Sequence, residues 1–258
     1  MYKSHSISFL TFADSRLACK DIIRNQAEKS VFFDKIYAFD EHDLDDWYLK
    51  KYADRLVLGS RGFGYWQWKS YLVRKIMDII NEGDILVYAD GGCTINEKGG
   101  KRLSDYFSIV ENSESGILGF DQGWRAAEWT KGDVFAYFGV SNERKYLDQS
   151  QVAGGVFVIR KCWKSQQFID EWFYVCHNHY NLITDEPSVF PNDKDFKENR
   201  HDQSVFSVLG TKYNIETIPV TEIFSESGYG NMQEYPIWAT RYKPTKHSLL
   251  WKLYHKLK

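Results

Sequence analysis

One short segment constrains the fold more than any other part of the chain. Residues 85–89 read ILVYA, five apolar residues in a row, and Asp90 and two glycines follow directly. A continuous apolar run of this length is typical of a parallel strand buried on both faces. Residues 69–81 carry apolar side chains at helical spacing, and Gly83 is a stop signal. The segment therefore predicts a helix followed by a buried strand of an α/β sheet.

The rest of the chain extends this pattern. Further strands are predicted at 6–12, 35–39, 152–160 and 213–220, and further helices at 17–27, 165–176 and 201–209. The polar residues 184–200, with two prolines, predict a long loop. We expect one α/β domain over residues 1–240, with a mostly parallel, Rossmann-like sheet flanked by helices and a C-terminal lobe. Its two halves would be 1–115 and 116–240.

Composition narrows the functional classes. The 258 residues have a formal net charge of −2, so no global field attracts nucleic acid, and we expect no nucleic-acid partner. The four cysteines are widely spaced without a C-x-x-C pair, which favours neither a disulfide framework nor a zinc ribbon. No apolar stretch reaches the roughly 18–20 residues of a spanning helix. These features predict a cytoplasmic protein.

Residues 241–258 differ from the rest, because leucines at helical spacing alternate with lysines. This pattern predicts a basic amphipathic helix. Such a helix lies either on an anionic membrane surface, here the inner face of the membrane, or on its own domain. Both interpretations fit the sequence.

The segment with the most chemistry is 61–69, RGFGYWQWK. Its basic side chains, its glycines and its aromatic rings suit a diphosphate and a sugar. Asp90 follows a buried strand, and the carboxyl ends of parallel strands are where open α/β sheets bind ligands. The alternative is that Asp90 only begins a turn before two glycines.

Three segments together carry a resemblance to a known family: GFGYWQWK at 62–69, YADGGC at 88–93 and HDQS at 201–204. The combination resembles the bacterial GT-A glycosyltransferases of surface polysaccharide synthesis. The resemblance implies a GT-A-like fold whose first half binds a nucleotide sugar and whose second half binds the acceptor. It also implies transfer of a hexose, from UDP by our expectation, to a glycan or lipid-linked oligosaccharide hydroxyl in O-antigen or capsule synthesis.

The resemblance also assigns residues to the donor. It implies donor contacts from Thr11, Phe12, Ala13, Arg61, Lys69, Arg74, Asp90 and Gly91. Each has an ordinary alternative, because Thr11 to Ala13 could simply end a strand and Lys69 and Arg74 could be solvated helix charges.

A divalent metal is the usual partner of the diphosphate in this family. The family signature is D-x-D, but Gly92 stands where the second acid is expected. Mn²⁺ or Mg²⁺ could be held by Asp90 together with His201. Alternatively, Arg61 and Lys69 could hold the phosphates without a metal.

The acceptor side needs a carboxylate that removes the proton of a hydroxyl if configuration inverts. The candidates are Asp202 first, then Asp121, with Glu128 as a third. Asp202 could instead cap the helix that follows it. Trp66, Trp124, Glu128 and Gly154 are predicted to contact the acceptor.

Two other functions compete with glycosyl transfer. A sugar-phosphate nucleotidyltransferase would share the nucleotide-binding sheet, but it normally has a glycine-rich basic loop after the first strand, which residues 11–16 lack. A non-catalytic carbohydrate-binding module would use Trp66, Trp68 and Trp124 as stacking surfaces. Nucleotide binding would separate the transferase from the binding module.

Overall fold

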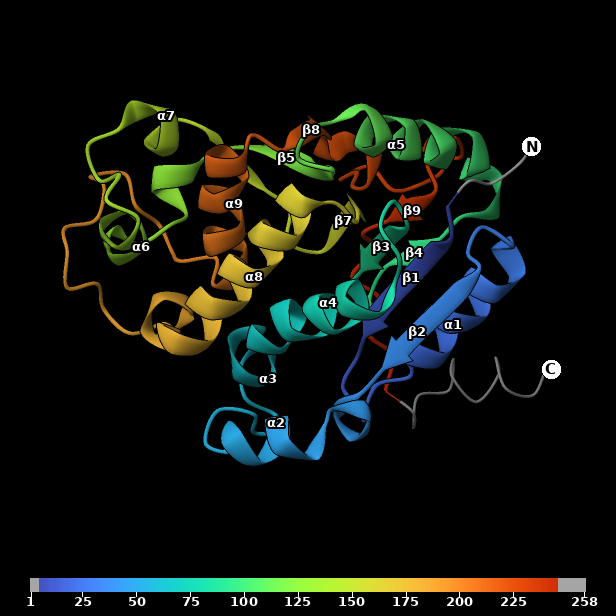
Figure 1. Cartoon of the computed structure of the whole chain (residues 1–258), viewed down its shortest axis with the longest axis horizontal. Helices are drawn as coiled ribbons and strands as arrows, with labels where there is room; N and C mark the ends of the chain where they lie inside the picture. The colour runs from blue at the N-terminus through green and yellow to red at the C-terminus, as the bar shows by residue number, and fades with distance from the viewer. Residues whose placement is uncertain (1–4, 246–258) are drawn as a thin grey trace.

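A seven-stranded sheet runs through the computed structural model, which describes residues 5–245 (Figure 1). Its order is β2-β1-β3-β7-β5-β6, and β8 pairs with β5. The strands are β1 (Ile7–Phe12), β2 (Lys35–Phe39), β3 (Ile85–Ala89), β5 (Ile117–Arg125), β6 (Ser150–Val152), β7 (Val156–Arg160) and β8 (Glu216–Pro219). Only β6 and β7 run against the other strands. The predicted α/β class and mostly parallel sheet are confirmed.

The apolar runs explain the central strands. All five residues of β3 are buried, and the predicted bounds of β2 and β3 agree with the observed ones. Side chains alternate between the two faces: Leu86 and Tyr88 belong to one core cluster, while Ile85 and Val87 belong to the other. The central strands therefore need apolar cover on both sides.

Helices supply that cover. The helices are α1 (Cys19–Ser30), α2 (Asp46–Lys51), α3 (Gly62–Tyr65), α4 (Gln67–Ile79), α5 (Gly100–Asn112), α6 (Gly132–Tyr137), α7 (Arg144–Leu147), α8 (Trp163–Asn178) and α9 (Asp202–Tyr213). Apolar side chains of α4, α8 and α9 bury one face of the sheet, and those of α1 and α5 bury the other. Figure 1 shows α8 lying between α4 and α9.

The strand predicted at 152–160 is divided. β6 and β7 both pair antiparallel with β5, and residues 153–155 leave the ladder between them. The reason is the sequence Ala-Gly-Gly, which gives the backbone freedom to bend. This break occurs beside the end of β3, since the amide of Asp90 donates to the carbonyl of Gly155 at 2.8 Å.

The described end of the chain is an extended strap, residues 240–245. The amide of Tyr242 donates to Gly92 O at 3.0 Å, and the amide of Ala18 donates to Pro244 O at 2.8 Å. Just before it, β9 (Ile237–Trp238) pairs with β4 (Thr94–Ile95). Of the basic helix predicted over 241–258, residues 246–258 lie outside the described part, and 241–245 belong to this strap.

Among the described residues, the helices are all too short or too polar to cross a membrane.

Candidate functional site

Four segments meet at the carboxyl end of β3. Asp90 follows this strand, and Gly91 lies against the end of β1, where its amide donates to Phe12 O at 3.3 Å. A Cβ on Gly91 would lie 2.7 Å from Ala13 Cβ and 2.8 Å from Phe12 O, so the close approach requires glycine. The break at 153–155 and the start of α9 complete the group. The structure thus brings the predicted strand ends together.

Lys69 lies at the centre of this group. Its side chain is 3% exposed, and its Nζ donates to Gly154 O at 2.8 Å. Nζ is also 3.3 Å from Asp90 Oδ1 and 3.4 Å from Asp202 Oδ2. One buried ammonium therefore joins two carboxylates that are far apart in sequence. Because Lys69 is enclosed, its sequence-based role as a phosphate contact gives way to a structural one, which is to hold the two acids.

Burial and charge shift the pKa values of Lys69 and Asp202. Burial raises the pKa of Asp202 to about 6, although the Lys69 ammonium opposes that rise. The two carboxylates outweigh the effect of burial on Lys69, whose pKa is raised, so the amine stays protonated. Asp90 accepts a hydrogen bond from the Tyr88 hydroxyl at 2.6 Å. Lys69 is thus a buried cation between two carboxylates, and Asp202 holds a proton more readily than an ordinary aspartate.

His201 fixes the start of α9. Its backbone has φ 58° and ψ −128°, a conformation that favours glycine, so its side chain must hold it there. Nδ1 lies 2.8 Å from Ile183 O, and the ring stacks on Trp66 at 5.2 Å between centroids. The polar neighbours of this ring are Ile183 O and, at 3.8 Å, the Asp185 carboxylate, and not Asp90, the partner proposed for it in a metal site. His201 instead positions Asp202, the next residue.

The turn before α4 has reversed handedness. Residues 62–66 all have positive φ, and two backbone bonds, Tyr65 N to Arg61 O at 2.8 Å and Trp66 N to Gly62 O at 3.1 Å, close it. Left-handed backbone costs a non-glycine residue about 1–2 kcal/mol, and three of these five residues are not glycine. Trp68 Nε1 donates to Gly62 O at 2.9 Å and helps to hold the turn. This turn sets where α4 begins and therefore where Lys69 lies.

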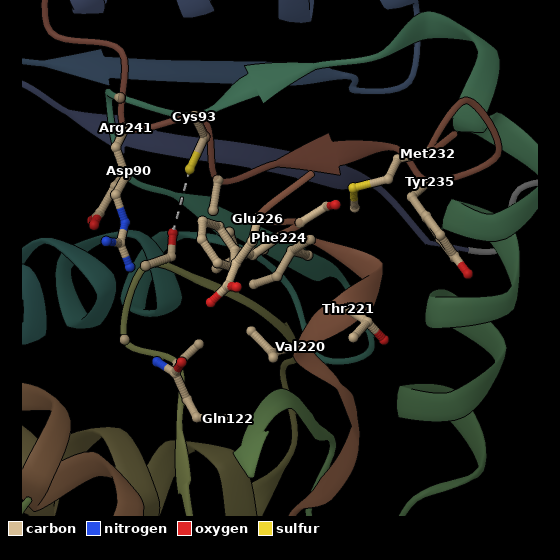
Figure 2. Close-up of a pocket in the computed structure, with 18 of the residues that line it drawn as sticks. Asp90, Cys93, Gln122, Val220, Thr221, Phe224, Glu226, Met232, Tyr235 and Arg241 are labelled. Carbon is tan, nitrogen blue, oxygen red and sulfur yellow. Dashed lines mark hydrogen bonds between the residues drawn. The ribbon is translucent and has the colours of Figure 1, made fainter. Parts of the chain in front are cut away.

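A cavity of about 780 Å³ opens from Asp90 along the carboxyl edge of the sheet. Figure 2 shows Asp90 and Arg241 on one side of it, Met232 and Tyr235 on the other, and Glu226 between them. The residues around it are Asp90, Gly92, Cys93, Gln122, Trp124, Ala153, Gly154, Gly155, Val156, Gln203, Val220, Thr221, Ile223, Phe224, Ser225, Glu226, Asn231, Met232, Tyr235, Ala239, Arg241 and Lys243. Asp90 and Glu226 are the two acids among them.

The strap supplies two cations to the cavity, and Figure 2 shows one of them, Arg241, at the Asp90 end. Arg241 and Lys243 line the cavity, and within residues 5–245 neither forms an ion pair. The Arg241 guanidinium lies over the Phe224 ring at 5.1 Å, and its backbone has φ 54°. Unpaired guanidinium and ammonium groups beside a cavity suit an anionic ligand.

The donor residues predicted from the sequence divide into two sets. Thr11, Phe12 and Ala13 are buried beside Gly91, next to the site. Arg61 and Arg74 form ion pairs with carboxylates elsewhere, Arg61 with Asp185 at 3.0 Å and Arg74 with Asp170 at 2.7 Å, and neither lines the cavity.

The predicted acceptor residues also divide. Trp124 and Gly154 line the cavity. Trp66 stacks on His201, and Glu128 pairs with Lys197 at 2.6 Å. Asp121 lines a different, smaller cavity, because neighbouring residues of β5 point to opposite faces and Gln122 takes the face with the larger one.

The site offers a metal few ligands. Asp90 provides one carboxylate, whose Oδ1 already contacts Tyr88 and Lys69. Within residues 5–245, the one group of three or more acids, histidines or cysteines spaced to hold a metal is Asp40, Glu41 and His42, beyond the end of β2. Lys20 and Ser15 already contact its two acids. A three-ligand protein cage does not fit at Asp90.

Sequence reasoning missed much of the cavity wall. Gln203 belongs to the HDQS segment, and its Oε1 accepts from Gly154 N at 3.1 Å, so that motif could have pointed to it. Glu226 lies in a stretch without periodicity, whereas Arg241 and Lys243 begin the segment predicted as a basic helix, whose positive charge was the available signal. The strap brings Arg241 and Lys243 to the cavity through hydrogen bonds with Gly92 and Ala18 that a sequence pattern does not reveal.

Comparison with known proteins identifies the fold. No protein-family model matches the chain, and no curated protein does. The chain is similar to the structure of a glycosyltransferase involved in the glycosylation of the major capsid of PBCV-1, with TM-score 0.53 and 10% identity over 90% of this chain and 91% of that one. Mouse xyloside xylosyltransferase 1 gives TM-score 0.45 and 12% identity over 93% and 86% of the two chains. The galactosyltransferase LgtC gives 0.43 and 12% over 87% and 78%. The first likeness shows the GT-A-like fold alone, and the other two scores are too low to add to it.

Proposed function

We propose that this GT-A-like protein is a glycosyltransferase that moves a hexose from a nucleotide sugar to a hydroxyl of a glycan acceptor. The observation that carries the proposal is the buried Lys69, which holds Asp90 at the mouth of a cavity large enough for both substrates. Carboxylates at a strand end bind sugar hydroxyls well, because each oxygen accepts more than one hydrogen bond. A surface polysaccharide acceptor and a UDP donor are parts of the same proposal.

The donor diphosphate would lie at the Asp90 end of the cavity. Arg241 and Lys243 would neutralise its charge and stabilise the nucleoside diphosphate as it leaves. A Mn²⁺ or Mg²⁺ ion would be held mainly by the diphosphate, since Asp90 and not the buried Asp202 lines this end of the described cavity. The two basic side chains would offer one cation for each phosphate of the diphosphate.

The acceptor would lie beyond the donor sugar, between Trp124 and Glu226. Trp124 offers a ring surface for stacking on a sugar, and the Glu226 carboxylate points into the cavity (Figure 2). Glu226 could accept the proton of an acceptor hydroxyl. Asp202, 3% exposed behind Lys69, would act as a positioning residue rather than as this base. Asp121, the second candidate for the base, lines the smaller cavity described above.

Nucleotide-dependent melting tests the proposal. UDP, GDP, CMP and their sugar conjugates are added with and without Mn²⁺, because a ligand that binds only the folded state raises the melting temperature. We expect one nucleotide to raise the melting temperature of the wild type. Arg241→Ala should need at least a tenfold higher concentration of that nucleotide for the same rise. Arg24→Ala, on the exposed face of α1, is the matched control. A protein that no nucleotide stabilises, but that glycans do, would instead be a binding module.

Transfer itself is measured by release of the nucleoside diphosphate. Asp90→Asn keeps the size of the side chain and removes its charge, so we expect a loss of turnover of at least a hundredfold with the fold retained. Full turnover in this variant would refute the site.

A further inference from the structure

We infer that the end of the cavity remote from Asp90 receives an apolar group of the acceptor, so that glycosides with an aryl or alkyl aglycone are preferred to free sugars. This inference rests on the proposed function and names its acceptor class.

The shape of the cavity separates two ends. It follows the carboxyl edge of the sheet from β3, past β5, to the end of β8. In Figure 2, Asp90 and Arg241 lie at one end, and Thr221, Met232 and Tyr235 lie at the other. Glu226 projects into the space between them. A ligand bound at Asp90 that extends along this cavity therefore passes Glu226.

The far wall is mainly apolar. Figure 2 places Met232 and Tyr235 at this end, with Thr221. The same stretch of chain adds the apolar residues Val220, Ile223, Phe224 and Ala239 to the cavity lining, and the polar residues Ser225 and Asn231. Asp90 and Arg241 lie at the other end and Glu226 lies in the middle. A sugar ring carries hydroxyls on most of its carbons and would leave them without partners against this wall, which is unfavourable. An apolar substituent would gain by leaving water there.

The wall is built and held open by its own contacts. Ile223 and Met232 are 2% and 4% exposed and serve as its floor. The amide of Ala239 donates to Ile223 O at 2.7 Å, and the Tyr229 hydroxyl donates to Ala239 O at 2.8 Å. The wall therefore does not depend on a ligand for its shape, as is usual for small-molecule sites.

The position of Glu226 sets the order of the groups. An acceptor hydroxyl must reach the donor sugar near Asp90, so the acceptor sugar lies beside Glu226. The aglycone of that sugar then falls beyond Glu226, against the apolar wall. A nucleobase at the same wall is the competing occupant, and a competition experiment tells the two apart.

The test compares phenyl and methyl glycosides of common hexoses by calorimetry. It is run on the full chain with the nucleotide that stabilises it at saturation. Burial of a phenyl ring predicts at least tenfold tighter binding of the phenyl glycoside. Val220→Ser should remove this preference. Ile218→Ser, a half-buried residue of β8 that does not line the cavity, should keep it.

Several other outcomes would contradict the inference. Equal affinities, failure of every phenyl glycoside to bind, or an unchanged preference in Val220→Ser overturns the inference. Competition between phenyl glycoside and nucleotide also overturns it, since it places the base at this wall. If Val220→Ser is unfolded by circular dichroism, Tyr235→Ser replaces it. Failure of all nucleotides to bind contradicts the proposed function, whereas nucleotide binding without a phenyl preference contradicts only this inference.

Discussion

Lys69 balances the charge of the site, and its removal would be costly. Methionine has a similar length but no charge, so Lys69→Met leaves the buried Asp202 carboxylate without its cation and facing Asp90, whose side chain is 41% exposed. We expect a loss of about 3–5 kcal/mol in the free energy of unfolding, as is usual when one partner of a buried ion pair is removed. Urea unfolding measures it.

Two variants check the cause of that loss. Lys75 lies on α4, as Lys69 does, and forms a partly exposed ion pair with Asp45. We therefore expect Lys75→Met to lower the free energy of unfolding by at most about 1 kcal/mol. Adding Asp202→Asn to Lys69→Met should recover part of the stability, because one of the two opposed charges is gone. Equal losses in Lys69→Met and Lys75→Met would contradict the role given to Lys69.

Asp202 predicts a specific dependence of stability on pH. Its pKa is about 6 in the folded protein and about 3.9 in an unfolded chain. Between these values the folded state binds more protons, so the contribution of this group is full below about pH 4 and falls as pH rises through 6. Asp202→Asn cannot titrate. Unfolding free energies of the two proteins at pH 4.5 to 7.5 should therefore diverge, and parallel curves would contradict the burial of this acid.

At the scale of elements, α1 ends in an unfavourable residue. Val31 is the residue after the helix, with φ 54°, and it is 83% exposed. A β-branched side chain is strained in this left-handed conformation and loses almost no contacts when removed. Val31→Gly should stabilise the protein by about 1 kcal/mol, which corresponds to about 2–4 °C in melting temperature.

An equally exposed valine is the control for that change. Val189 is 88% exposed and does not have positive φ, so Val189→Gly should give no gain. If both variants melt like the wild type, backbone strain at the end of α1 is smaller than the geometry indicates.

The elements also show where sequence patterns suffice. β2 and β3 were predicted with their observed bounds, because polar residues and glycines delimit their apolar runs. α5 was not predicted, since its buried side chains Leu103, Tyr106 and Val110 are separated by polar ones. The strand at 152–160 was predicted whole because Gly154 and Gly155 permit a bend without requiring one, and contacts with Asp90 and Lys69 fix it.

The site was partly predictable, because some of its residues belong to local sequence features and others are brought together by packing. Asp90 was recognised because a strand end is a local feature, and Asp202 because of its motif. The contact of Lys69 with both acids depends on how α4 and α9 pack, which periodicity does not specify. Arg241 and Glu226 were missed because hydrogen bonds of the strap and short helical turns, rather than a repeating pattern, set their positions.

At the scale of the whole molecule, the two predicted halves share one sheet. β7 from the second half pairs with β3 from the first, and both core clusters contain residues of both halves. We therefore expect one cooperative unfolding transition. Tryptophan fluorescence and far-ultraviolet circular dichroism should give the same urea midpoint. Two separate midpoints would show that the halves unfold independently.

The reversed turn at 62–66 has a consequence for substitution tolerance. Its backbone is locally the mirror image of an ordinary helix, so a residue with the opposite chirality would fit it without steric penalty. In a library of all single substitutions, isoleucine, valine and threonine should be depleted at Phe63, Tyr65 and Trp66. Asparagine and glycine tolerate this backbone, so at these positions they should be depleted only because the aromatic contacts are lost. A stretch that looks like the start of a helix would thus carry the tolerance profile of a tight turn.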